Sequence, residues 1–189
     1  MQTNGQIRED KGQWLIHWEG VDVVVSKEDA AALRAQTELP VKTSSLQAGA
    51  LDWATALALQ YKPRVDIETT WGQLQEGGIV GPTYESYFVV AYFNGNHYGE
   101  FRPGTNPAQA SAIFDTYRVC TEIAGDGWAA LVNDCFCPAT YAKSMKGETR
   151  VVAGLRAVVR DELGDTVQVP VEFLPPAARL AALRTAVIA

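Results

Sequence analysis

The chain has 189 residues, of which 47% are hydrophobic and 20% are charged, a balance typical of one globular domain with additions rather than of a disordered chain. Its 16 Lys and Arg residues stand against 22 Asp and Glu residues, which gives a net charge of -6. Because affinity for nucleic acid rests on neutralising phosphates with basic side chains, this charge disfavours nucleic acid as a partner.

The sequence carries no sign of a membrane or secretory segment. No apolar run approaches the roughly 20 residues that a helix needs to span a bilayer, and residues 1–10 are polar without an apolar signal core. Three cysteines, Cys120, Cys135 and Cys137, make a poor disulfide framework. We therefore expect a cytoplasmic protein without a membrane partner. Whether the cysteines do more than pack is left open, and we predict no metal site for them, because they could bind a metal ion only if folding brought them together with a fourth ligand.

The first 40 residues predict a small ββα element after a loose lead-in over residues 1–12. Gln13–Trp18 and Val21–Val25 have the composition of strands, with a turn between them. Ser26 is a good helix N-cap, and acidic residues follow it in the first helical turn. We interpret residues 1–40 as an N-terminal extension that augments a larger sheet.

Residues 41–60 carry the clearest helical pattern. Ser44 and Gln47 have the spacing of a capping box, and apolar residues recur on one helical face. Trp53 lies on that face, so we expect it in the core. Asp52 points elsewhere and is a candidate to hold a loop or a ligand.

A hairpin is predicted in the middle of the chain. Residues 65–81 are ambiguous, whereas Tyr84–Phe93 is rich in aromatic and β-branched residues and predicts a strand. Asn94-Gly95 favours a tight turn, and His97–Phe101 would be the returning strand.

The stretch over residues 101–114 combines turn chemistry with polar side chains. Two prolines and a glycine exclude regular sheet from its first half. Asn106 stands directly before Pro107, where it can cap a short helix that runs through Ile113 or Phe114.

The rest of the chain predicts three strands, at Thr116–Ile123, Trp128–Val132 and Val167–Val169. An irregular connection is expected over Cys135–Lys146. Glu148–Leu163 predicts a second main helix, and Gly164 is placed to end it. A third helix is expected over Ala177–Val187.

Together these elements predict an α+β fold: an antiparallel sheet with two main helices packed on one face, plus the N-terminal ββα extension and a C-terminal helix. The segments would be residues 1–40 for the extension, residues 41–174 for the main domain and residues 175–189 for the last helix.

Three separated blocks of sequence form a further pattern. Residues 41–54 include Leu-Asp-Trp-Ala, residues 103–109 read Pro-Gly-Thr-Asn-Pro-Ala-Gln, and residues 147–170 contain Val-Ala-Gly-Leu-Arg-Ala-Val-Val and Leu-Gly-Asp-Thr-Val-Gln-Val-Pro. Their order and spacing over residues 41–170 resemble the NinX family, small proteins of unknown function encoded by tailed bacteriophages and prophages. The resemblance implies a phage accessory protein in the host cell cytoplasm and no proven activity.

The chain departs from that family in the polar block. Pro107 stands where the family usually has Trp, and Ala110-Ser111 replace its Gly-Gly. A loop that binds through an aromatic face or a close backbone approach would therefore bind differently in this chain.

Four polar residues of the loop are candidate ligand contacts: Arg102, Thr105, Asn106 and Gln109. A guanidinium, a hydroxyl and two amides within eight residues can recognise a phosphate, a ribose or a base edge. The alternative is that these side chains satisfy the backbone of their own loop.

Asp52 and Arg156 complete the predicted ligand-binding set. Arg156 lies in an otherwise apolar helical run, so its guanidinium needs a partner carboxylate or an anionic ligand. Both interpretations stay open at this point.

Catalytic signatures are missing from the sequence, which has no Gly-x-Ser-x-Gly elbow, P-loop or His-Glu-x-x-His motif. The two histidines, His17 and His97, fall in predicted strands, and the spacing of the carboxylates selects no working pair. We therefore predict a noncatalytic protein that uses no cofactor or metal ion.

The sharpest hypothesis is a counter-defence protein that binds and sequesters a small nucleotide signal. One alternative is an acidic interaction protein that inhibits a host protein. The other is a small metal-dependent nucleotide hydrolase. A homo-oligomer is compatible with all three.

Overall fold

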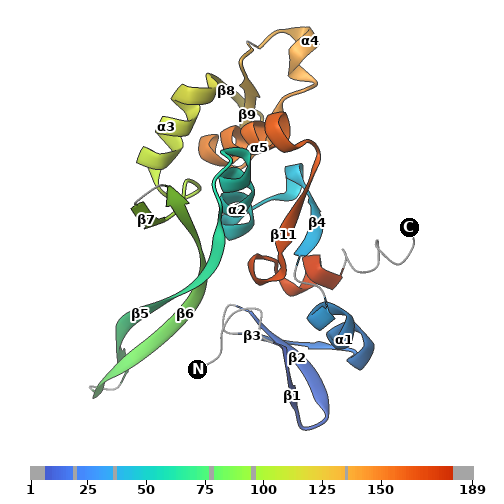
Figure 1. The fold of residues 1–189 in the computed structure, drawn as a ribbon, viewed down its shortest axis with the longest axis vertical. Helices are drawn as coiled ribbons and strands as arrows, with labels where there is room; N and C mark the ends of the chain where they lie inside the picture. Colours follow the sequence, from blue (N-terminus) through green and yellow to red (C-terminus); the bar gives the residue numbers. More distant parts are fainter. Residues whose placement is uncertain are drawn as a thin grey trace. The chain divides into compact units, whose positions relative to one another are not determined.

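A computed structural model of the chain describes residues 7–18, 21–35, 38–76, 79–94, 97–134 and 136–180 (Figure 1). The chain divides into two compact units. The first unit comprises Met1–Leu39, Val65–Val89 and Pro170–Ala189, and the second comprises Pro40–Arg64 and Val90–Val169. No helix among the described residues has both the length and the apolar character needed to cross a membrane.

The strands are β1 (Ile7–Asp10), β2 (Gln13–Trp18), β3 (Val21–Val25), β4 (Glu38–Lys42), β5 (Arg64–Glu76), β6 (Ile79–Asn94), β7 (His97–Glu100), β8 (Val119–Ala124), β9 (Gly127–Val132), β10 (Met145–Gly147) and β11 (Thr166–Pro170). The helices are α1 (Lys27–Ala35), α2 (Ala48–Ala58), α3 (Pro107–Tyr117), α4 (Pro138–Tyr141) and α5 (Arg150–Leu163), with short 3-10 helices η1 (Thr43–Ser45) and η2 (Val171–Phe173). Antiparallel sheets with several helices confirm the predicted α+β class.

The strands form four sheets, ordered β1-β2-β3, β10-β9-β8, β11-β4 and β5-β6-β7. The predicted hairpin in the middle of the chain is β6 paired with β7, with Ala91 opposite Glu100. Gly95, in the predicted turn, lies outside the described residues. Residues 65–81, ambiguous in sequence, contribute β5 and the start of β6.

The N-terminal ββα element is present and has one strand more than predicted. β2 and β3 pair antiparallel, and α1 follows Ser26, whose Oγ accepts a hydrogen bond of 3.0 Å from the Asp29 amide. The lead-in prediction is wrong for residues 7–10, because β1 pairs with β2 across Lys11 and Gly12. Both turn residues have positive φ, 50° and 79°, which matches the twist of a tight two-residue hairpin.

In the second unit, α5 lies across the sheet of β8, β9 and β10, and α2 and α3 pack against α5 (Figure 1). Ala129 and Ala130 of β9 are fully buried where the sheet meets the helix. Leu155 and Val158 of α5 are also fully buried. α3 crosses α5 at Gly154, where a Cβ atom would stand 2.2 Å from Cζ of Phe114. The absence of a side chain at this glycine therefore sets the distance between the two helices.

The second main helix ends as predicted but begins at Arg150, two residues later than expected. Thr149 caps its start by accepting a 3.1 Å hydrogen bond from the Val152 amide. Gly164 ends it with φ of 88°, and its amide donates to the Arg160 carbonyl at 2.9 Å.

The predicted helix over residues 41–60 is wrong at its start, because α2 begins only at Ala48. Val41 and Lys42 instead belong to β4, which pairs with β11, and Thr43–Ser45 form η1. Thr43 fixes this arrangement: its amide donates to the Asp165 carbonyl at 2.9 Å and its Oγ1 to the Gly164 carbonyl at 2.7 Å. The capping box of Ser44 and Gln47 is absent, since Gln47 precedes α2 without a side-chain cap. Long-range pairing overrides the local helix signal.

Three further boundaries differ from the prediction. α3 runs to Tyr117, so the strand expected from Thr116 begins only at Val119. The connection expected to be irregular over residues 135–146 contains α4 and the start of β10. Residues 176–180 are helical, and the rest of the predicted third helix lies outside the described residues.

Candidate functional site

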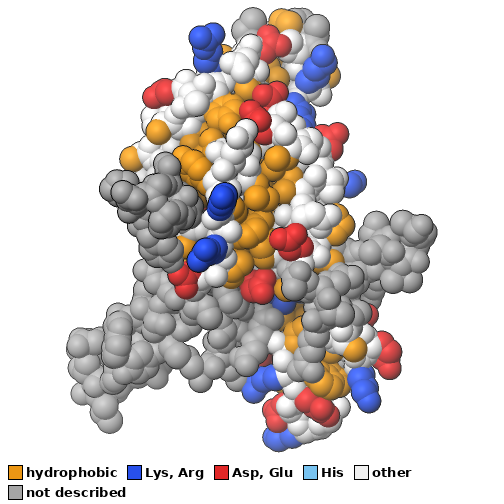
Figure 2. Space-filling model, in the orientation of Figure 1, with side chains coloured by type: hydrophobic (Ala, Val, Ile, Leu, Met, Phe, Trp, Pro, Cys, Tyr) orange, Lys and Arg blue, Asp and Glu red, His pale blue; other side chains and the backbone are white. Residues whose placement is uncertain are grey.

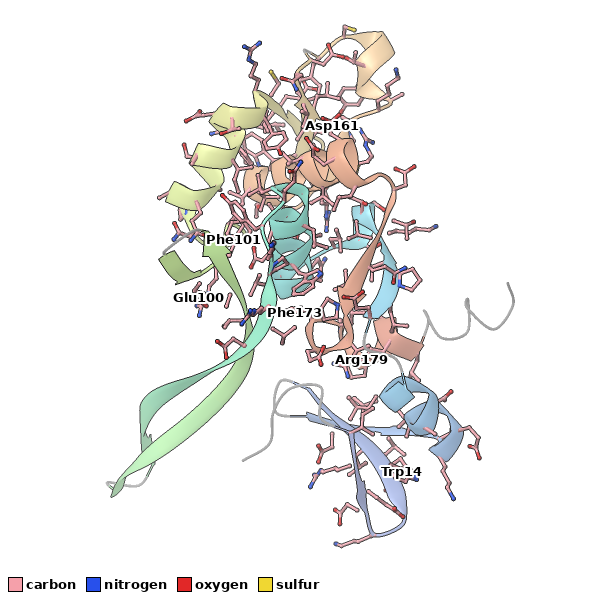
Figure 3. The ribbon with its side chains drawn as sticks, viewed as in Figure 1. Trp14, Glu100, Phe101, Asp161, Phe173 and Arg179 are labelled. Carbon is pink, nitrogen blue, oxygen red and sulfur yellow. The ribbon has the colours of Figure 1, made fainter. Side chains whose placement is uncertain are left out.

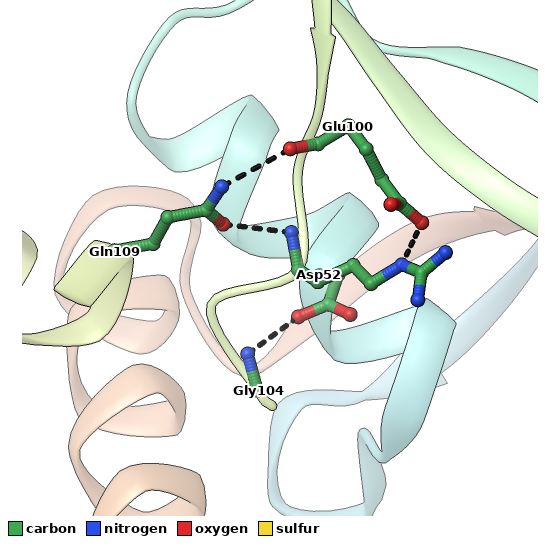
Figure 4. A network of polar contacts seen from close by, with 5 residues as sticks. Asp52, Glu100, Gly104 and Gln109 are labelled. Carbon is green, nitrogen blue, oxygen red and sulfur yellow. Dashed lines mark hydrogen bonds and ion pairs between the residues drawn. The ribbon is translucent and has the colours of Figure 1, made fainter. Parts of the chain in front are cut away.

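The loop that follows β7 is held by its own backbone and by one glutamine. The carbonyl of Arg102 accepts hydrogen bonds from the amides of Thr105 and Asn106, at 3.1 and 2.7 Å. The side chain of Gln109 accepts a hydrogen bond from the Arg102 amide at 2.8 Å and donates one to the Glu100 carbonyl at 3.0 Å (Figure 4). Gln109 thus ties α3 to both sides of the loop.

The remaining loop candidates also have local structural roles. Oδ1 of Asn106 caps α3 by accepting hydrogen bonds from the amides of Ala108 and Gln109, at 3.1 and 3.3 Å. Arg102 Nε forms an ion pair with the Glu100 carboxylate, and Thr105 is exposed. Asn106 and Gln109 therefore satisfy backbone groups of their own segment, which is the alternative that the sequence left open.

Asp52 of α2 joins this network from the other side. Its side chain is buried, and Oδ1 accepts a hydrogen bond of 2.8 Å from the Gly104 amide (Figure 4). Burial raises the pKa of Asp52 to about 7, although the Gly104 hydrogen bond and the charge of Arg102 act in the opposite direction. A Cβ atom on Gly104 would lie 3.0 Å from that same oxygen, so the close approach favours glycine.

A first cavity of about 430 Å³ adjoins the network through Phe101 and Gln109. It is lined by Leu59, Tyr61, Phe101, Gln109, Ala112, Ile113, Thr116 and Tyr117. Three aromatic rings and three aliphatic side chains share this lining with Gln109 and Thr116, and no Lys or Arg of the described residues belongs to it. Asp52 does not line it.

A second cavity of about 510 Å³ lies elsewhere in the same unit, beside Arg156 of α5. It is lined by Ser44, Ala124, Asp126, Gly127, Trp128, Ser144, Met145, Lys146, Gly147, Glu148 and Arg156. Its lining thus combines two cations, two carboxylates, two hydroxyls and an indole ring, which are groups that can contact a polar, partly aromatic ligand.

Arg156 is the most buried of these charged groups, with its side chain 7% exposed. Nε donates to the Leu46 carbonyl at 2.9 Å, and Nη1 donates to the Lys146 carbonyl at 2.8 Å. Glu148 Oε2 lies 3.7 Å from Nη1, which is long for a hydrogen bond. Burial lowers the pKa of Arg156, with Glu148 acting against that shift. Among the described residues, Nη2 makes no hydrogen bond, so the guanidinium keeps donors for a ligand.

Of the six predicted ligand contacts, Asp52, Arg102, Asn106 and Gln109 meet in the loop network, Thr105 is an exposed loop residue and Arg156 lies apart from them. The sequence did not indicate Trp128, Lys146 or Ser144 as ligand contacts, because the second cavity is assembled from segments far apart in the chain. The one sequence feature that pointed to this cavity was Arg156, an arginine in an otherwise apolar helical run, and it was among the predicted ligand contacts.

The visible face of the second unit carries apolar side chains in orange over the region of α2, α3 and α5, with acidic and basic side chains interspersed (Figure 2). Because charges of both signs are interspersed on this face, the charge of each cavity is set by the residues that line it.

In the described part of the chain, no group of three or more His, Cys, Asp or Glu residues is arranged to hold a metal ion. Cys120 and Cys137 are exposed, while Cys135 and the side chains of His17 and His97 lie outside the described set.

The sequence matches no protein-family model, and it matches no curated protein.

Proposed function

We propose that this protein binds a small phosphorylated, nucleotide-like ligand in the cavity beside Arg156 and releases it chemically unchanged. The observation that carries the proposal is the Arg156 guanidinium, a buried cation on the cavity lining with a donor nitrogen that no described residue occupies. A phosphate oxygen at Nη2 would form a charge-assisted hydrogen bond, which is about twice as strong as a neutral one.

The other lining groups match the remaining parts of such a ligand. Lys146 supplies a second cation, and its Nζ lies 3.9 Å from the centroid of the Tyr141 ring. Trp128 offers an indole on which a base can stack. Asp126 and Glu148 can accept hydrogen bonds from ribose hydroxyls or from a base amine.

The noncatalytic part of the proposal rests on the sequence, which carries none of the common catalytic motifs. Asp52, the carboxyl with a pKa near 7, lines neither cavity, so it has no route to a ligand in them. The resemblance of residues 41–170 to NinX proteins extends the proposal to a setting: a phage or prophage accessory protein that sequesters a nucleotide immune signal in the host cytoplasm.

The test is calorimetric titration of the purified chain with inorganic pyrophosphate and with cyclic di- and trinucleotides. Arg156→Lys should weaken binding by about 10-fold or more, because the three donors of a lysine share one nitrogen, which cannot stand at the positions of Nε, Nη1 and Nη2 at once. Glu148→Gln should strengthen it several-fold, because the change removes a carboxylate beside the bound phosphate.

Asp115→Asn is the matched control for Glu148→Gln. It removes one carboxylate from an exposed position of α3 that does not line the cavity, and it should leave affinity unchanged. The ligand should be recovered intact after denaturation, with or without Mg²⁺. Equal effects of the two variants would overturn the site, and a hydrolysed product would overturn the noncatalytic reading.

A further inference from the structure

The first cavity has a different chemistry from the Arg156 cavity. Tyr61 and Phe101 form a corner of its lining, with ring centroids 5.6 Å apart and planes at 84°. Tyr117, in the last turn of α3, supplies a third ring. Three aromatic rings thus line one cavity of about 430 Å³, where a single guest can contact more than one of them.

Negative charge gathers beside this aromatic corner. Burial raises the pKa of Tyr117, and so do the carboxylate of Glu162 and the charge of Asp161. Both acidic residues come from the last turns of α5, where Figure 3 labels Asp161, while Phe101 directly follows β7. The hydroxyl of Tyr117 also lies 3.5 Å from the Ala58 carbonyl, another partial negative charge.

Among the described residues, no basic side chain lines the cavity to balance these charges. The lining contains neither Lys nor Arg, and the nearby Arg102 forms an ion pair with Glu100. Gln109 is held by the Arg102 amide and the Glu100 carbonyl, so its amide is fixed in place beside Phe101.

We propose that this cavity binds a small organic cation, such as a quaternary ammonium group, between Tyr61, Phe101 and Tyr117. Aromatic faces attract a cation through the ring quadrupole, and a desolvated site strengthens that attraction. A quaternary ammonium suits this aromatic lining because it carries charge without hydrogen-bond donors that need partners. The carboxylates of Asp161 and Glu162, whose charges act on Tyr117, favour a cation beside that ring and disfavour an anion.

The proposed cation site is separate from the Arg156 cavity and does not rest on the proposed function. The two share no lining residue. A chain that binds choline and ignores pyrophosphate would support one proposal and reject the other.

The decisive comparison is between choline and its uncharged carbon isostere, 3,3-dimethyl-1-butanol, titrated into the full chain and followed by NMR. The two molecules have nearly the same shape, so only the charge distinguishes them. Choline should bind saturably and about 10-fold more tightly than the isostere. Equal binding would show an apolar pocket without cation preference and would overturn the proposal, as would a lack of saturation with choline.

Variants place the site within the cavity. Tyr61→Leu should reduce choline affinity about 10-fold, whereas Tyr141→Leu, which changes a tyrosine of α4 outside the cavity, should leave it unchanged. Glu162→Gln alters an exposed residue, so the fold should persist. It should weaken choline several-fold and leave the isostere unaffected; an equal loss for both probes would contradict the electrostatic role.

Discussion

The carboxylate of Asp52 accepts a hydrogen bond of 2.8 Å from the backbone amide of Gly104, which lies 52 residues away in sequence. This contact attaches the loop after β7 to α2. The Asp52 carboxyl is buried at this contact, and burial disfavours its charged form, so its pKa is raised from 3.8 to about 7. The same residue thus supports the loop and makes the stability of this unit depend on pH.

Replacing Asp52 with Asn should reveal that dependence. Because the folded-state pKa is raised, the stability that Asp52 contributes is fully present below pH 3.8 and is lost as the pH rises to about 7. Asn keeps an oxygen for the Gly104 amide and cannot ionise. Asp52→Asn should therefore be more stable than the parent at pH 8, with an advantage on the order of 1.4 kcal/mol for each unit of pKa difference.

Urea unfolding of both proteins at pH 5 and pH 8 provides the measurement. The advantage of the variant should shrink toward pH 5, where Asp52 itself is protonated in the folded state. An advantage of equal size at both pH values would show that the carboxyl ionises without cost, contrary to its burial.

The crossing of α3 and α5 predicts a steric effect at Gly154. A methyl group there would stand 2.2 Å from the Phe114 ring, so Gly154→Ala should cost about 1–3 kcal/mol of unfolding free energy. In a Phe114→Leu background the ring is gone, and the same change should cost less. A double-mutant cycle measures this coupling, and additive effects would mean that the ring is not what Gly154 accommodates.

Asn106 offers a test of the structural role of the polar loop. Asn106→Ala should lower stability by about 1 kcal/mol through loss of the α3 cap, whereas Asn106→Asp keeps an acceptor and should be nearly neutral. Neither change should alter the affinity for pyrophosphate, because Asn106 does not line the Arg156 cavity. A loss of pyrophosphate affinity in the Asn106→Asp variant would indicate that the ligand binds at the loop and not in the Arg156 cavity.

Thr43 gives a fourth prediction, on the junction between β4 and α2. Its buried hydroxyl donates to the Gly164 carbonyl at 2.7 Å. Thr43→Val keeps the shape and removes the donor, so it should cost about 1–3 kcal/mol. Thr43→Ser keeps the donor and should cost less; thermal unfolding of the pair separates the hydrogen bond from the lost methyl group.

Local signals were enough to predict several elements. Strand-like composition around a turn indicated β2 and β3, Ser26 and Asn106 marked helix starts, and Gly164 marked a helix end. Each of these features depends on neighbours within a few residues. Trp53 was correctly expected in the core from its place on an apolar helical face.

Long-range contacts account for what the sequence could not show. The start of α2 is set by Thr43 bonding to Asp165 and Gly164, more than a hundred residues later. The polar side chains of the loop were candidates for ligand contacts because their partners within the chain could not be seen in the sequence. Gln109, for example, donates to the Glu100 carbonyl, a contact that depends on how the loop turns. The two cavities arise only where distant segments converge, so local sequence patterns do not reveal them.

The most direct test of the central claim observes the guanidinium of Arg156 itself. Its side-chain N–H resonances can be followed by NMR while pyrophosphate is added, with the Arg102 resonances as an internal control. We expect a saturable shift at Arg156, which Glu148→Gln should bring to lower ligand concentration, and no shift at Arg102. Unchanged Arg156 resonances at saturating pyrophosphate, or shifts that grow linearly on exposed side chains alone, would contradict it.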